Sequence, residues 1–230
     1  MGPGSPQALT ITVDGAGTTV SALLQLPPDA RALYVFAHGA GAGMTHAFMA
    51  AFASGLAERA VATLRFQFPS MEKGARRPDP PAIAHAAVRA AVAAAADAAP
   101  GLPLFAGGKS FGGRMTSQAQ AASALPNVRG LVFVGFPLHP AGKPADERAQ
   151  HLQQVALPML FLQGTRDELA DLGLLRPVIE SLGERATLEL FDNADHAFHV
   201  PARTGRRDAD VRHDMLDATV RWIDRILDPR

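Results

Sequence analysis

The sequence predicts an α/β domain built on a mostly parallel sheet with helices on both faces. Short runs that are apolar at every position, such as Ala32–Ala37, alternate along the chain with segments of helical periodicity. Strands that are buried on both faces of a parallel sheet have this continuous apolar character. Alternation of such strands with helices favours parallel pairing through crossover connections.

Length, net charge and cysteine content limit the number of domains, the partners and the cellular location that we expect. At 230 residues the chain is expected to form one domain, residues 1–230. Its formal net charge is zero, with 22 basic and 22 acidic residues, so we expect no nucleic-acid partner and no binding to an anionic membrane. It has no cysteine, and its N-terminus lacks a signal-peptide pattern. These features predict a cytoplasmic protein.

The first half of the chain is expected to open with an antiparallel pair. Two β-prone segments, Leu9–Val13 and Thr18–Leu26, flank an Asp14-Gly15 step that favours a hairpin turn. The elements that follow are strand Ala32–Ala37, helix Phe48–Ala60, strand Val61–Phe66 and the alanine-rich helix Ala82–Ala99. A proline-rich loop, 67–81, separates the last two, and loops at strand ends commonly contact ligands.

The second half continues the alternation. The expected elements are strand Leu102–Ala106, helix Arg114–Leu125, strand Gly130–Gly135, a short polar helix Ala145–Val155, strand Leu157–Gln163, helix Leu169–Leu182, strand Ala186–Phe191 and helix Asp208–Leu227. The last helix has one apolar face, which makes it an amphipathic cover for the sheet.

A G-x-S-x-G pattern stands between a strand and a helix, at Gly108, Ser110 and Gly112. In this context a serine can occupy a sharp turn with its hydroxyl exposed above the sheet. The N–H of Phe111 would then point, at a helix N-terminus, toward an oxyanion formed on a substrate. Taken alone, the pattern is equally compatible with an ordinary tight turn.

A glycine-rich loop follows the strand Ala32–Ala37 and begins at His38. Backbone N–H groups in such a loop can approach either a phosphate or an oxyanion. The loop matches neither G-x-G-x-x-G nor a P-loop, so we expect it to bind an oxyanion rather than a nucleotide phosphate.

A carboxylate and an imidazole follow two further buried strands. Asp167 comes directly after Leu157–Gln163, and His196 comes shortly after the last strand. The resulting chain order, Ser110, Asp167, His196, is the order of an α/β-hydrolase triad.

With these residues in place, the chain resembles the α/β-hydrolases along nearly its whole length. It is most similar to a small, capless, dienelactone-hydrolase-like group that includes the testis-expressed protein 30 and KAT8-regulatory subunit 3 types. The shared stretches are H-G-A-G from His38, R-F-x-F-P-x-M-E from Arg65, G-K-S-x-G-G-R-M from Gly108 and G-T-R-D from Gly164. The resemblance implies an α/β-hydrolase fold with a mostly parallel eight-stranded sheet, helices on both faces and no separate cap domain. It does not specify a substrate.

The resemblance also implies a mechanism. Ser110 is the expected nucleophile, His196 the general base and Asp167 the carboxylate that orients the imidazole. The oxyanion would be held by the N–H groups of Phe111 and Ala40. The expected activity is hydrolysis of a small carboxylic ester or thioester through an acyl-enzyme, and the alternative is a non-catalytic interaction module.

Other residues compete for these roles or border the site. Asp171, Asp192 and Asp195 are the rival carboxylates, and they are interpreted as solvated loop residues because only Asp167 follows its strand by a short turn. Residues considered for substrate contact are His38, Gly39, Arg76, Arg77 and His199, of which the two arginines could clamp a carboxylate.

Metal chemistry receives little support from the sequence. There is no H-E-x-x-H motif, and His196 and His199 stand three apart without an obvious third ligand. We therefore expect no metal and no cofactor. A small-molecule ester is the expected partner, and a homodimer is compatible with the sequence.

Overall fold

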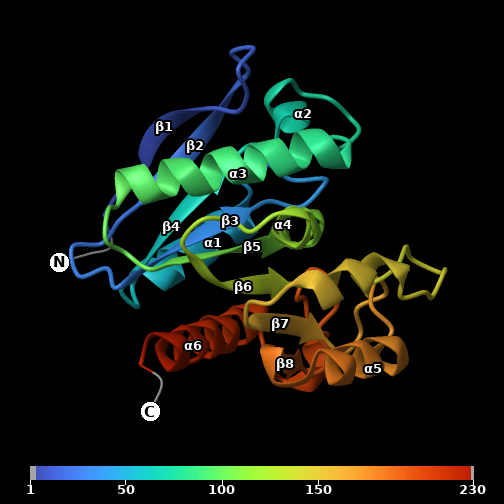
Figure 1. Cartoon of the computed structure of the whole chain (residues 1–230). Helices are drawn as coiled ribbons and strands as arrows, with labels where there is room; N and C mark the ends of the chain where they lie inside the picture. The colour runs from blue at the N-terminus through green and yellow to red at the C-terminus, as the bar shows by residue number, and fades with distance from the viewer. Residues whose placement is uncertain (1–3, 229–230) are drawn as a thin grey trace.

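The computed structural model describes residues 4–228, which form an eight-stranded sheet with the order β1-β2-β4-β3-β5-β6-β7-β8 (Figure 1). The first strands pair antiparallel, β1 with β2 and β2 with β4. All later pairs are parallel. The mostly parallel sheet that the sequence predicted is therefore confirmed.

The observed elements lie close to the expected ones. The strands are β1 Gln7–Thr12, β2 Thr19–Gln25, β3 Ala32–Ala37, β4 Val61–Phe66, β5 Leu104–Lys109, β6 Val128–Val134, β7 Met159–Gly164 and β8 Ala186–Phe191. The α-helices are α1 Ala47–Ala57, α2 Pro69–Glu72, α3 Pro81–Ala98, α4 Phe111–Ala122, α5 Leu172–Leu182 and α6 Asp208–Leu227. Three short 3₁₀ helices are η1 Glu147–Gln154, η2 Gly183–Arg185 and η3 Ala202–Thr204.

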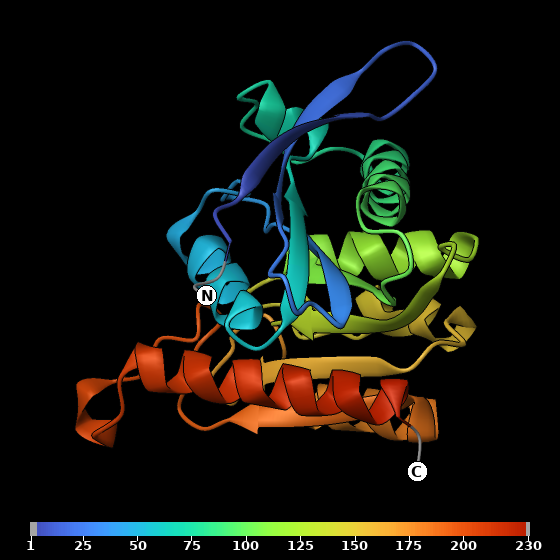
Figure 2. The ribbon, with the colours of Figure 1, turned by 90° about the vertical axis from the view of Figure 1, so that its left-hand side faces the viewer.

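Helices cover both faces of the sheet, as expected. One face packs against α3, α4 and α5, and the other against α1 and α6 (Figure 2). Every residue of β3 and of β4 is buried. The sequence of β3 is continuously apolar, as is typical of a strand covered on both faces, whereas β4 also contains Thr63 and Arg65. Burial on both faces fixes the position of these central strands.

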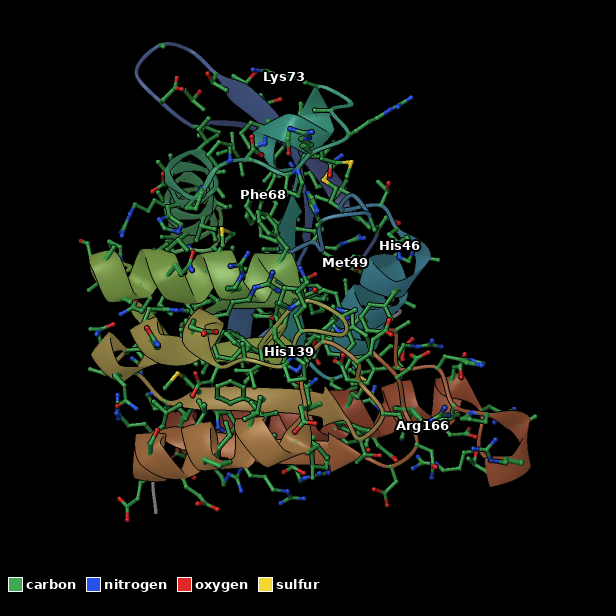
Figure 3. All side chains as sticks on the ribbon, turned by 90° about the vertical axis from the view of Figure 1, so that its right-hand side faces the viewer. His46, Met49, Phe68, Lys73, His139 and Arg166 are labelled. Atoms are coloured by element: carbon green, nitrogen blue, oxygen red, sulfur yellow. The ribbon has the colours of Figure 1, made fainter. Side chains whose placement is uncertain are left out.

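The parallel strands end at one edge of the sheet, and Figure 3 looks onto that edge. The loops that follow β3, β5, β7 and β8 therefore meet there, although they are distant in sequence. The connection from β6 to β7 contains only the short η1 helix. Across residues 4–228 no separate cap domain covers this edge.

Two segments differ from the expected secondary structure. The loop after β4 contains a short helix, α2, which begins at Pro69. Its last residue, Glu72, accepts hydrogen bonds from the backbone N–H and the hydroxyl of Ser21, at 3.0 and 2.8 Å. This contact with β2 is tertiary, so local sequence patterns did not reveal it. The short polar helix is 3₁₀ rather than α.

The described residues contain no helix that is both long enough and apolar enough to span a membrane.

Helix α6 closes one face of the sheet through Trp222. This side chain is 3% exposed, and its ring lies edge-on to Phe105 of β5 with 5.8 Å between centroids. The apolar face predicted for this segment is thus the buried face, with Val211, Met215 and Ile223 also inaccessible to solvent.

We predict that Trp222→Ala lowers the free energy of unfolding by ~3–5 kcal/mol, because it removes a large buried side chain and leaves a cavity under α6. The neighbouring surface variant Arg221→Ala should change it by less than ~0.5 kcal/mol. Urea denaturation followed by far-UV circular dichroism measures both free energies. Tryptophan fluorescence is unsuitable, because Trp222 is the single tryptophan and one variant lacks it. Equal effects in the two variants would show that α6 is not held by this contact.

Candidate active site

Ser110 occupies a strained turn between β5 and α4. Its backbone angles are φ 50° and ψ −115°, which residues other than glycine seldom adopt. A Cβ atom on Gly108 or Gly112 would lie 2.4 or 2.6 Å from the carbonyl oxygen of Ala37. Glycine at both positions therefore allows the turn to press against the end of β3. The strand-turn-helix context expected of the G-x-S-x-G pattern is present.

His196 lies in the turn after β8 and faces Ser110. Its Nε2 is 2.9 Å from Ser110 Oγ, and its Nδ1 is 2.7 Å from Asp167 Oδ2. The imidazole is 23% exposed, whereas the carboxylate of Asp167 is 1% exposed. Three side chains from three loops are thus brought into one hydrogen-bonded series. Because the carboxylate accepts from Nδ1–H, Nε2 is free to accept the proton of the serine hydroxyl.

Asp167 is held by more than the histidine. Its Oδ1 accepts from the N–H of Leu169 at 2.8 Å, and its Oδ2 accepts from Nε2 of Gln163 at 2.5 Å. The amide oxygen of Gln163 in turn accepts from the N–H of Phe136 at 3.0 Å. These bonds fix the orientation of a buried carboxylate. Sequence reasoning missed Gln163, because nothing local distinguishes it from any other residue at the end of a strand.

The rival carboxylates have other roles. Asp195 Oδ1 accepts from the N–H groups of Ala197 and His199, at 2.8 and 2.9 Å, and so builds the turn that carries His196. Asp171 caps the N-terminus of α5 by accepting from the N–H of Gly173 at 2.8 Å. Asp192 is exposed. None of the three is hydrogen-bonded to the imidazole of His196.

A second serine and histidine lie close together elsewhere. Ser117 Oγ on α4 is 2.8 Å from His151 Nε2 on η1. Burial, together with Arg114 and His85, lowers the pKa of His151 to about 4. Ser117 is fully buried, and within residues 4–228 no carboxylate bonds to His151. This pair therefore lacks both substrate access and an orienting acid.

A cavity of about 310 Å³ opens beside Ser110. Most of its wall is apolar or backbone, and it includes the first residues of the loop after β3. Figure 3 labels His46, on this wall at the start of α1. The other lining residues are Gly39, Ala40, Gly41, Ala42, Phe48, Lys109, Ser110, Leu169, His196 and Ala197.

A larger cavity, of about 520 Å³, lies at the opposite edge of the sheet. It is formed around the residues that precede β5 and β6, including Leu102 and Asn127, and its single ionisable lining residue is Arg129. Because it offers neither a nucleophile nor a base, we take the smaller cavity as the candidate site.

The loop that begins at His38 forms one side of the site. Gly39 and Ala40 line the cavity, and a Cβ on Gly39 would lie 3.8 Å from the Cβ of Ser110. Phe111 is the first residue of α4, where backbone N–H groups have no intrahelical acceptor. Of the two residues expected to bind an oxyanion, Ala40 therefore lies in the cavity wall and Phe111 directly follows Ser110 in the chain.

His38 itself is buried, and its imidazole joins the start of this loop to the segment after β4. Its Nε2 accepts from the N–H of Phe68 at 3.0 Å, while its Nδ1 is 2.7 Å from the carbonyl oxygen of Gly39. Burial lowers the pKa of His38, which favours the neutral imidazole that these contacts require. His38 does not line the cavity.

Three further expected contacts do not reach the cavity. Arg76 and Arg77 are exposed in the segment after α2, and neither lines the cavity. His199 is exposed and pairs with Asp208 at 2.9 Å, a contact that raises the pKa of the imidazole. Their role in substrate binding stays a prediction that the cavity lining does not favour.

Lys109 is a site residue to which the sequence assigned no chemistry. Its Nζ donates to the carbonyl oxygen of His196 at 2.6 Å and lies 5.5 Å from the centre of the Phe198 ring. Burial lowers its pKa to about 8, against the opposing effect of Asp167 and Asp195. The bond joins the end of β5 to the loop that carries the histidine.

No group of three or more His, Cys, Asp or Glu side chains suited to a metal ion occurs within the described part of the chain.

Solved structures with this fold include a lidless α/β serine hydrolase from Xanthomonas campestris. It is 24% identical to this chain, with a TM-score of 0.72 and 96% of each chain covered. A dienelactone hydrolase from Anabaena variabilis is 19% identical with a TM-score of 0.72, covering 95% of this chain and 97% of that one. The esterase domain of a Rhodothermus marinus protein is 18% identical with a TM-score of 0.73, covering 96% and 99%. At these identities the similarity shows the fold.

The family profile described as "Alpha/beta hydrolase domain" matches residues 30–224. That match extends from just before β3 into α6 and includes all three residues of the hydrogen-bonded series around Ser110. The chain therefore belongs to the α/β-hydrolase family.

Proposed function

We propose that this protein is a serine hydrolase that cleaves a small carboxylic ester or thioester through an acyl-enzyme. The observation that carries the proposal is the continuous series Ser110 Oγ, His196 imidazole, Asp167 carboxylate, with 2.9 and 2.7 Å between its members. A serine hydroxyl becomes a strong nucleophile when a base within hydrogen-bond reach removes its proton. In this proposal the whole chain, residues 1–230, acts as one domain.

The reaction would proceed in two halves. Ser110 Oγ attacks the carbonyl carbon while His196 Nε2 takes the hydroxyl proton, giving a tetrahedral intermediate with a negative oxygen. As that intermediate collapses, the bond to the leaving group breaks and the imidazolium returns its proton to the leaving oxygen or sulfur. Water then attacks the acyl-enzyme with His196 as base, releasing the acid and restoring Ser110. Each step uses only protein groups and water.

Asp167 would stabilise the imidazolium that forms in each half. Its carboxylate is almost fully buried, so its interaction with a positive ring is screened little by solvent. The bonds from Gln163 and from the N–H of Leu169 keep it aligned before the reaction begins. Such preorganisation lowers the cost of developing charge in the transition state.

The oxyanion would be bound by the N–H groups of Phe111 and Ala40. The first lies at the N-terminus of α4, where the helix dipole favours a negative charge. The second lies in the cavity wall formed by the loop after β3. Two such backbone donors would stabilise the negative oxygen that develops during acyl transfer.

The cavity favours a small, uncharged acyl group. Its volume of about 310 Å³ is at the lower end of the usual range for ligand sites, and its wall includes the apolar side chains of Phe48 and Leu169. An arginine clamp for a substrate carboxylate is not part of the proposal. Solved relatives named as a dienelactone hydrolase and an esterase domain support an ester as the substrate class. Cytoplasmic location, the lack of a nucleic-acid partner and a homodimer stay predictions from the sequence.

We predict that Ser110→Ala lowers kcat for p-nitrophenyl acetate by ~10⁶, since loss of the nucleophile leaves only binding and oxyanion effects. Ser117→Ala is the matched control and should stay within about tenfold of wild type. Circular dichroism establishes that both variants are folded. Wild-type turnover in Ser110→Ala would refute the nucleophile. A wild-type protein without hydrolysis above buffer, across a panel of esters and thioesters, would favour the non-catalytic interaction module.

We also predict that Asp167→Asn lowers kcat by ~10⁴, because the amide neither supports the imidazolium nor enforces the correct tautomer. Asp195→Asn should lower it by less than about tenfold. Asparagine at 195 keeps the side-chain oxygen that accepts from Ala197 and His199, so the turn survives. Steady-state kinetics on the same ester gives the ranking, and the reverse order would assign the acid to Asp195.

A further inference from the structure

Arg65 is a buried charge that the proposed mechanism does not use. It lies on β4 and is 2% exposed, and its Nε is buried without a hydrogen-bond partner. Among residues 4–228 no carboxylate lies within ion-pair distance of its guanidinium. Burying an unpaired charge is costly, and replacing buried charges by apolar side chains of similar volume is often neutral or stabilising. Stability alone therefore does not explain this arginine.

The guanidinium contacts the loop that lines the candidate site. Its Nη1 donates to the carbonyl oxygen of Met44 at 2.9 Å. Two residues further along the chain, Oε1 of Gln67 accepts from the N–H of the same Met44 at 2.8 Å. Both main-chain polar groups of Met44 are thus bonded to side chains from the end of β4. A charged donor makes the first of these bonds stronger than a neutral one.

The loop itself, residues 38–46, has few other restraints. It lies outside the sheet, and its internal main-chain bonds are two turns, from Ala42 N to Gly39 O at 3.4 Å and from His46 N to Gly43 O at 3.1 Å. A Cβ on Gly43 would lie 2.8 Å from Gln67 Oε1, so the loop passes directly against this side chain.

A third anchor lies at the start of the loop. His38 Nε2 accepts from the N–H of Phe68, and the two rings pack edge to face at 4.9 Å. Figure 3 labels Phe68, just past the end of β4, and His46, where the loop enters α1. The residues from Arg65 to Phe68 therefore hold the loop near both of its ends.

We propose that Arg65 and Gln67 are positioning residues that fix Met44 and thereby hold the loop carrying Gly39 and Ala40 against Ser110. The inference rests on the proposed function, because the Ala40 N–H is the donor whose place is being held. An oxyanion donor acts through preorganisation, so a loop that relaxes weakens the transition state more than it weakens substrate binding. The R-F-Q-F-P stretch, residues 65–69, thus has a proposed role, which we infer from its contacts with the loop.

The test compares four substitutions at three buried or half-buried positions of one segment. Arg65→Met and Gln67→Leu each remove one bond to Met44 and keep much of the side-chain volume. Thr63→Val is the matched control: Thr63 is fully buried in β4, two residues before Arg65, and its hydroxyl has no hydrogen-bond partner. All variants are first checked for folding by urea denaturation. Should Arg65→Met fail to fold, Gln67→Leu tests the same main-chain anchor from a half-buried position.

The kinetic readout is kcat and KM for p-nitrophenyl acetate. Arg65→Met and Gln67→Leu should each lower kcat by ~10–100-fold, less than the ~10²–10³-fold typical of deleting a donor outright, with KM within about threefold. Arg65→Lys, which keeps a charged donor, should recover part of the loss, and Thr63→Val should match wild type. Unchanged kcat in both Arg65→Met and Gln67→Leu, or an equal loss of kcat in Thr63→Val, would overturn the proposal.

A second readout separates this inference from the proposed function. Amide hydrogen exchange of the peptide that spans residues 39–46 should be at least ~10-fold faster in Arg65→Met and Gln67→Leu, and unchanged in Thr63→Val. This measurement needs no activity. Faster exchange in a protein that hydrolyses no ester would contradict the proposed function and leave the anchoring intact, whereas wild-type exchange in an active enzyme would contradict the anchoring alone.

Discussion

The backbone at Ser110 is the constraint on which the site depends. Positive φ at a non-glycine residue costs of order 1–3 kcal/mol, so the surrounding structure has to enforce it. The enforcement comes from β5, which lies between β3 and β6 in the sheet and is bonded to both. Its end is pressed against Ala37 where only glycine fits, and α4 begins immediately after the turn. Sheet, turn and helix together present the serine hydroxyl at the edge where the other loops converge.

Those loops are held by side chains as well as by main-chain hydrogen bonds, such as the bond from Arg166 N to Ala194 O at 2.9 Å. Gln163 fixes the loop of Asp167, Lys109 holds the carbonyl of His196, and Arg65 contacts the loop after β3. Each bond joins the end of a buried strand to a loop. A buried polar group without a hydrogen-bond partner destabilises the fold. The buried side chains at these strand ends therefore favour conformations in which the loop atoms bonded to them stay in place. The rigidity of the strands is in this way transmitted to the residues of the proposed mechanism.

Much of this structure was predictable from the sequence. Continuous apolar runs identified the buried strands to within a few residues, because burial on both faces leaves a strong local signal. The order of Ser110, Asp167 and His196 identified residues that the structure brings together, since parallel strands end at a common edge. Gln163 and the bonds of Arg65 were not predictable, because they join segments through contacts that depend on side-chain direction. Likewise, Leu169 and Ala197 line the cavity, whereas the arginine pair after α2 turns to solvent.

Covalent labelling of the wild-type protein with a fluorophosphonate, followed by peptide mass spectrometry, tests the proposed nucleophile most directly. The fluorophosphonate reacts with a serine that an adjacent base has activated. We expect one phosphonyl group per chain, attached to Ser110 and not to Ser117, with ester hydrolysis lost in proportion to labelling. Hydrolysis that persists when Ser110 is fully modified, or an active enzyme that the probe labels at another residue, would contradict the proposed mechanism.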